Sequence, residues 1–126
     1  MPQTIPFICR WSDSGVGAAW MHVAGELDLA TVPQFEAALH AAQIKAWTVV
    51  VDLRALTFID CLGAHAIADA AARARQEGRR LMVVRGGRQV NKVLTLTGAA
   101  AGLEIFDLEP PAGGLKRAPE TVWAVA

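Results

Sequence analysis

The chain has 126 residues, of which 53% are hydrophobic and 19% charged, and its formal net charge is zero. This composition predicts one globular domain with a core of its own, and the balanced charge disfavours a dedicated nucleic-acid binder, which usually carries a basic surplus. No apolar run approaches the roughly 20 residues that span a bilayer, Met1–Thr4 lack a basic signal-peptide start, and the two cysteines form no disulfide framework, so a cytoplasmic protein without a membrane span is expected.

The first part of the chain predicts a β-hairpin followed by a loop. Residues 5–11 and 16–24 are rich in β-branched and aromatic residues, and they flank a turn cluster of serine, aspartate and glycine. The next segment, residues 25–29, carries the carboxylates Glu26 and Asp28 and is predicted to be a loop.

A helix and a central strand are predicted next. Thr31, with Gln34 three residues later, has the form of a capped helix start, and apolar residues at helical spacing extend this helix to about Ile44. Residues 47–53 form a β-branched run without alternation, which is typical of a strand covered on both faces. A short turn is predicted before a second apolar step at residues 58–59.

The second half of the chain alternates helices with strands. The predicted elements are a helix over residues 62–77, a strand over 81–84, a helix over 88–97 and a weak element over 103–106 that fits either a strand or a helix edge. This order predicts an α/β fold with a mixed sheet and packed helices. We expect the domain to occupy residues 1–109, followed by a Pro/Gly linker and a C-terminal tail over 110–126, docked or loose.

A charged site is predicted where the helix over residues 62–77 begins. Asp60 and Cys61 stand at its N-terminus, where unpaired backbone N–H groups and a partial positive charge are exposed. Loops that follow the strands gather on one rim. The other carboxylates expected at this rim are those of Glu26, Asp28 and Asp52. A Mg²⁺ pocket is an alternative for these groups, but capping of helices and turns is favoured, so we predict no metal and no cofactor.

Four segments together resemble a known family. They are Gly25–Thr31, Val50–Leu53, Phe58–Gly63 and Val93–Gly98. In order and spacing they resemble the successive blocks of STAS domains, particularly those of bacterial anti-sigma-factor antagonists, over about residues 5–108. The resemblance implies a mixed sheet with helices largely on one side and a non-enzymatic role in binding a kinase-type anti-sigma factor.

One position departs from the family pattern. The resemblance places the phosphorylatable Ser or Thr directly after Asp60, where this chain has Cys61, followed by Leu62. A thiol is no substrate for an ordinary Ser/Thr kinase step, so we expect binding that is not switched by phosphorylation there. The expected contact surface consists of Glu26, Asp28, Asp60, Cys61, Leu62, Gly63 and His65. Asp28 and Asp60 are expected to set its charge, and Gly63 to admit the partner's backbone.

Two alternatives to this function stay open. The chain fits a small STAS-like accessory subunit of a lipid-transport ATPase complex. It also fits a redox-sensing regulator based on Cys61, because a helix N-terminus favours a reactive thiolate whereas neighbouring carboxylates oppose it. An enzyme with Cys61 as nucleophile is disfavoured, since the sequence places no histidine beside it as a base.

Overall fold

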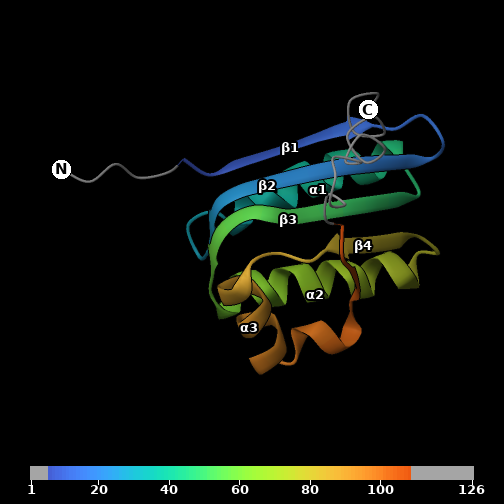
Figure 1. Cartoon of the computed structure of the whole chain (residues 1–126). Helices are drawn as coiled ribbons and strands as arrows, with labels where there is room; N and C mark the ends of the chain where they lie inside the picture. Colours follow the sequence, from blue (N-terminus) through green and yellow to red (C-terminus); the bar gives the residue numbers. More distant parts are fainter. Residues whose placement is uncertain (1–5, 109–126) are drawn as a thin grey trace, which may run out of the picture.

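Five strands form one sheet in the order β1-β2-β3-β4-β5 (Figure 1). The computed structural model describes residues 6–108. The strands are β1 (Ile8–Asp13), β2 (Ala18–Leu27), β3 (Thr48–Ile59), β4 (Arg80–Val84) and β5 (Glu104–Phe106). β1 pairs with β2 in antiparallel fashion, and the remaining neighbours pair in parallel, so the sheet is mixed as predicted.

The helices pack on one face of this sheet. They are α1 (Val32–Lys45), α2 (Cys61–Gln76) and α3 (Arg88–Leu96), and a short 3-10 turn, η1 (Ala99–Gly102), precedes β5. Alternation along β3 divides the two faces: Val49 and Val51 pack in the main core with the helices, whereas Val50 and Asp52 face the other side. The α/β architecture with helices on one side is therefore confirmed.

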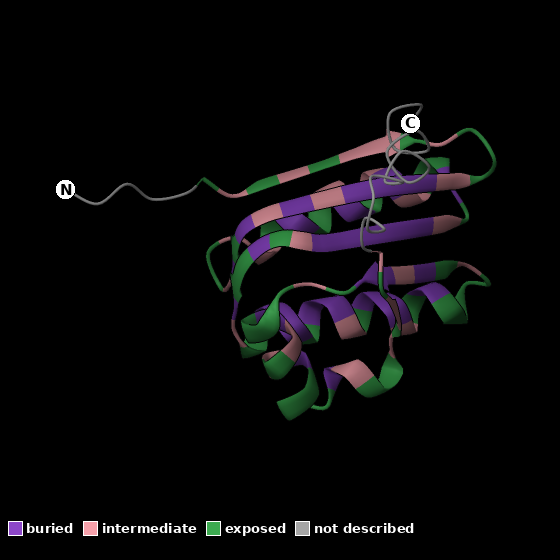
Figure 2. Ribbon diagram, viewed as in Figure 1, coloured by how far each residue is buried: buried purple, intermediate pink, exposed green. Residues whose placement is uncertain are grey.

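Burial follows the same division (Figure 2). Buried residues fill much of β2, β3 and the sheet-facing side of α2, whereas β1 at the sheet edge has none. Phe35, Met21 and Leu27 are fully buried in the main core; burying a side chain of this size stabilises the fold by roughly 1.5–3 kcal/mol. The helix-free face carries a smaller apolar cluster. It consists of Trp20, Val50 and Val84, with Met82, Phe106 and Leu108 against it.

Two predicted interruptions are absent from the strands. Residues 25–27, predicted as part of a loop, complete β2, and the turn predicted after residue 53 is part of β3. The reason is that the two strands pair in parallel as far as Leu27 and Ile59, and they absorb the irregular stretch in register shifts around Gly25. The weak element at 103–106 proves to be a short edge strand, β5.

The predicted linker and tail over residues 110–126 lie outside the described residues. Within residues 6–108, no helix is long and apolar enough to cross a bilayer.

Candidate functional site

The N-terminal tip of α2 stands at the rim where β2 and β3 end. Leu27 and Ile59 are paired at the ends of these parallel strands, and the Asp60 backbone N–H donates to the Leu27 carbonyl at 3.2 Å. Asp28 directly follows Leu27 in the chain. The structure therefore brings Asp28 and Asp60 to the same rim, as the sequence predicted.

Asp60 caps α2. Its backbone is extended, and its Oδ1 accepts a hydrogen bond from the Gly63 backbone N–H at 2.8 Å, which satisfies one of the free donors of the first turn. Cys61 and Leu62 follow on the exposed side, and His65 is exposed one turn further along α2. The cap thus fixes the position of Cys61 at the start of α2.

Gly63 lies inward, not on the surface. It is buried, and a Cβ at this position would stand 2.5 Å from the Leu27 carbonyl oxygen and 2.8 Å from Cγ1 of Ile59. The expected role of admitting a partner's backbone is wrong, because the space that glycine leaves is taken by β2. Gly63 lets α2 begin flush against the ends of the strands.

The turn after β2 is held by Asp28 and Thr31. The Thr31 hydroxyl donates to the Glu26 carbonyl at 2.7 Å and accepts from the Asp28 N–H at 3.0 Å, while Oδ1 of Asp28 accepts from the Ala30 N–H at 3.0 Å. Thr31 makes no side-chain cap to α1, so the predicted capping box with Gln34 is wrong. The hydroxyl instead ties the turn to β2 and holds Asp28 at the rim.

Gln89, on α3, supports the same rim and was not predicted. Its side-chain amide accepts from the Ile59 N–H at 3.1 Å and donates to the Ile59 carbonyl at 3.0 Å. β4 pairs with β3 only as far as Asp52, so this amide takes the place of a neighbouring strand at the end of β3. No local pattern in the sequence marks Gln89 for this task.

Exposed apolar side chains surround the tip. Leu29, Leu62 and Phe58 are 71%, 48% and 39% exposed, and Phe58 is paired with the exposed residue Glu26 across the strands. Exposed apolar residues rimmed by polar ones are typical of a surface that binds another protein. We call this surface the docking face. Its members are Glu26, Asp28, Leu29, Phe58, Asp60, Cys61, Leu62 and His65.

A sequence model of the STAS domain matches residues 14–110 of the chain. The chain belongs to the STAS domain family. Comparison of this STAS domain with curated proteins gives no match.

Solved structures share the STAS fold. The unphosphorylated anti-sigma factor antagonist SpoIIAA matches with a TM-score of 0.68 and 17% identity, over 94% of this chain and 99% of that one. An anti-sigma factor antagonist from Mycobacterium paratuberculosis matches with a TM-score of 0.69 and 22% identity, over 95% and 98%. The murine solute carrier 26 family member A9 anion transporter matches with a TM-score of 0.63 and 17% identity, over 86% of this chain but 18% of the transporter.

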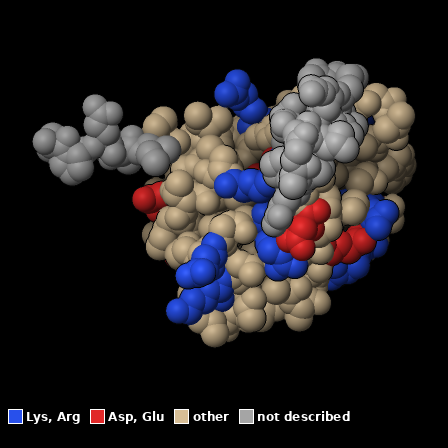
Figure 3. Space-filling model, in the orientation of Figure 1, with Lys and Arg blue, Asp and Glu red and all other residues tan. Residues whose placement is uncertain are grey.

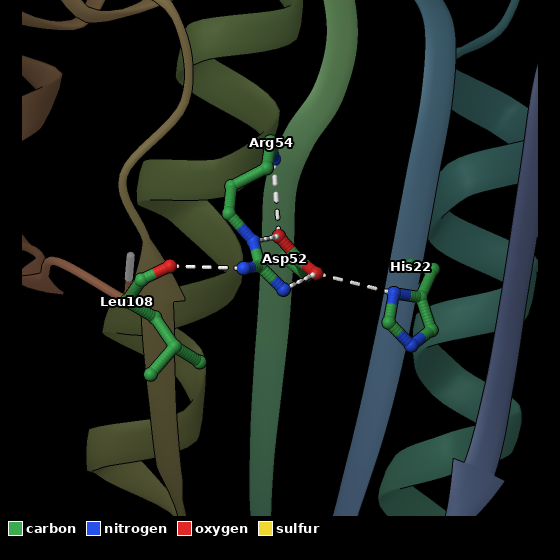
Figure 4. Close-up of polar contacts among 4 residues, drawn as sticks. All are labelled: His22, Asp52, Arg54 and Leu108. Carbon is green, nitrogen blue, oxygen red and sulfur yellow. Dashed lines mark hydrogen bonds and ion pairs between the residues drawn. The ribbon is translucent and has the colours of Figure 1, made fainter. Parts of the chain in front are cut away.

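Asp52 lies away from the docking face of this STAS domain, so its predicted place at the rim is wrong. It sits within β3 on the helix-free face and is 4% exposed (Figure 4). Arg54 holds both carboxylate oxygens at 2.9 and 3.0 Å, and Nδ1 of His22 lies 3.2 Å from Oδ2. Burial raises the pKa of Asp52, but the hydrogen bonds and charge of Arg54, together with His22, lower it more, and the net pKa lies below its usual value.

The carboxylates predicted for the rim are therefore divided between two places. Asp52 is separated from those of the rim, and residues 6–108 contain no group of three or more His, Cys, Asp or Glu side chains arranged to hold a metal ion. On the face shown in Figure 3, basic side chains gather over α3, and acidic ones lie near β5, where Arg80 pairs with Glu104 and Arg85 with Asp107 at 2.7 Å each. These pairs are exposed and belong to the surface of the fold.

Proposed function

We propose that this STAS domain is a binding module of the anti-sigma-factor antagonist type. It acts in the cytoplasm, catalyses no reaction and binds a kinase-type anti-sigma factor through the docking face. The observation that carries the proposal is the exposed thiol of Cys61 at the Asp60-capped start of α2, beside the exposed side chains of Leu62 and Phe58.

The surroundings of Cys61 support binding over catalysis. A nucleophilic cysteine is commonly activated by an adjacent base, and within the described part of the chain no hydrogen bond or ion pair joins Cys61 to a histidine. The exposed apolar side chains Leu29 and Leu62 have the character of interface anchors, which become buried only when a partner arrives.

The carboxylates at the tip of α2 explain why phosphorylation there would affect partner binding. A phosphate adds about −1.5 to −2 charges, and next to Asp28 and Asp60 it would repel both carboxylates. Cys61 offers no hydroxyl to accept a phosphate, so this charge is not added at the position. The proposed module therefore stays competent to bind under conditions in which a Ser or Thr at this position would be phosphorylated.

A redox-sensing regulator remains the second candidate, and it rests on the exposure of Cys61. Oxidation to a sulfenic acid or a mixed disulfide would alter the same surface. No contact among residues 6–108 favours the lipid-transport accessory subunit.

Calorimetric titration with a kinase-type anti-sigma factor from the same genome tests the proposal. The wild type is expected to bind, and Cys61→Asp to weaken binding by about tenfold or more, since it adds a charge inside the interface. Trp47→Ala is the matched control: Trp47 is 62% exposed and precedes β3, at the end of that strand opposite the tip. Equal affinities of the wild type and Cys61→Asp would contradict the proposed docking face.

Phosphorylation is tested with the same partner and ATP. Intact-mass measurement is expected to show no added phosphate on the wild type and one phosphate on Cys61→Ser, because only the serine offers a hydroxyl at the tip of α2. Stoichiometric phosphate on the wild type would show that the protein is switched at another residue.

A further inference from the structure

One row of side chains crosses the helix-free face at the level of Asp52. Strand register places Arg10 of β1 opposite His22 of β2, and His22 opposite Asp52 of β3. Asp52 is engaged by His22 and Arg54 (Figure 4). On the other side of His22 stands the guanidinium of Arg10, which forms no ion pair with any residue of 6–108.

Asp52 fixes the ring of His22. Its Oδ2 lies 3.2 Å from Nδ1, and the second ring nitrogen points away from Asp52 (Figure 4). A carboxylate held rigidly on one imidazole nitrogen orients the ring for whatever the other nitrogen contacts. Asp52 is itself held by three contacts from Arg54: two from the guanidinium and one from the backbone N–H. The imidazole ring of His22 therefore has a fixed orientation on the surface beside β1.

A hollow of about 380 Å³ lies beside His22 on this face. It is lined by Ile8, Arg10, Trp11, Ser12, His22 and Ala24. Its volume falls at the small end of the range found for ligand pockets. The lining includes a guanidinium, a hydroxyl and an imidazole, and no carboxylate, and Asp52, the acidic partner of the imidazole, is not part of it.

The guanidinium of Arg10 is the feature that points to a ligand, because Arg10 lines the hollow and forms no ion pair with any residue of 6–108. His22, directly opposite Arg10, already has the carboxylate of Asp52 on its other side, so Arg10 is the group with which an anion in the hollow would pair. A guanidinium offers a planar fork of donors that matches a carboxylate. The apolar members of the lining, Ile8 and Ala24, are paired with each other one step along the same strands.

We propose that this hollow binds a small organic carboxylate. The carboxylate pairs with Arg10 and accepts from the Ser12 hydroxyl, and the ring of His22, set by Asp52, bounds it. The apolar body of the ligand lies on Ile8 and Ala24. This site is formed by β1 and β2 on the helix-free face, and its existence does not depend on the function proposed for the docking face.

Titration of the ¹⁵N-labelled full chain with benzoate, followed by NMR, tests this site. Saturable shifts are expected for the backbone signals of residues 8–12 and 22–24, and none at the α2 tip. Arg10→Gln is expected to weaken benzoate binding by about tenfold or more, because it removes a charge-assisted pair. Arg88→Gln, which changes an exposed arginine at the start of α3, is the matched control and should bind benzoate as the wild type does.

Two further ligands define the chemistry. Benzyl alcohol, a neutral compound of similar shape, is expected to bind at least about tenfold more weakly than benzoate. Inorganic phosphate, which lacks the apolar body, should also bind more weakly. The proposal is overturned if benzoate produces no saturable shift at millimolar concentrations, if Arg10→Gln binds it as tightly as the wild type, or if phosphate binds as tightly as benzoate.

Discussion

The carbonyl oxygen of Leu27 occupies the space that a side chain at Gly63 would need: a Cβ there would lie 2.5 Å from that oxygen. Leu27 is the last residue of β2, and Gly63 stands in the first turn of α2. The same carbonyl accepts from the Asp60 N–H. The tip of α2 is therefore set against backbone atoms, which have little freedom to move aside, and its position depends on the absence of a side chain at residue 63.

Gly63→Ala is expected to lower the free energy of unfolding by about 1–3 kcal/mol. The added methyl meets a backbone carbonyl on one side and Cγ1 of Ile59 on the other, so α2 must shift away from the strand ends. Urea denaturation measures the change. Gly102→Ala is the control: a Cβ at exposed Gly102 would meet nothing closer than the guanidinium of Arg75 at 3.8 Å, so the free energy of unfolding should change little. Equal stability of both variants would contradict the close approach of α2 to β2.

Two substitutions of Asp60 separate its cap from its charge. Asp60→Ala removes the acceptor for the Gly63 N–H and is expected to cost about 1 kcal/mol of stability. Asp60→Asn keeps an acceptor and should cost less than half of that. Thermal or urea unfolding checks the stabilities. If the carboxylate also contributes charge to the docking face, Asp60→Asn should weaken binding of the anti-sigma factor although its fold is intact. If Asp60→Asn binds the anti-sigma factor as tightly as the wild type does, the role of Asp60 is limited to capping α2.

The fold could be predicted because its signals are local. The unbroken β-branched run at residues 49–51 and the helical spacing of apolar residues after Thr31 each identify an element by its own periodicity. The strand ends could not be found in this way. Whether Glu26 belongs to a loop or to β2 is decided by pairing with Phe58, which lies far along the chain.

The candidate site could likewise be predicted only where its residues are marked by local sequence patterns. Asp60 and Cys61 were found because a strand end followed directly by a helix start is visible in the sequence. The support from Gln89 was missed, since it joins α3 to the end of β3 through a side-chain amide. Asp52 was placed at the rim because a carboxylate after a run of valines resembles a strand end, whereas β3 continues to Ile59.

The ion pair of Asp52 should make stability depend on pH in the acid range. Its pKa in the folded protein lies below the usual value, so its contribution is fully present above about pH 3.9, the ordinary pKa of aspartate, and is lost as the pH falls through the lower, folded pKa. Asp52→Asn is expected to lower the unfolding free energy by about 3 kcal/mol at neutral pH. The unfolding free energies of the wild type and of Asp52→Asn should converge at acid pH.

Unfolding measured between pH 2 and 7 tests this dependence. Asp69→Asn, at an exposed carboxylate of α2 that forms no ion pair within residues 6–108, is the control and should follow the wild type throughout. A stability difference between the wild type and Asp52→Asn that stays constant down to pH 2 would contradict the account.

The two thiols should differ greatly in reactivity for a reason unrelated to signalling. Cys61 is exposed, whereas burial raises the pKa of Cys9 to about 12 from 9.0. At neutral pH this lowers the thiolate fraction of Cys9 by about 1000-fold, and the thiolate is the species that reacts. A thiol probe is expected to modify one cysteine of the native protein quickly and the second only after unfolding, with mass spectrometry assigning the first to Cys61.

Because burial suppresses the reactivity of Cys9, faster labelling of Cys61 than of Cys9 does not establish a redox switch. The proper reference is a free thiol such as glutathione under the same conditions. A rate for Cys61 close to that of glutathione would fit the docking residue proposed above. A rate tenfold or more higher, abolished in Cys61→Ser, would favour the redox-sensing regulator instead.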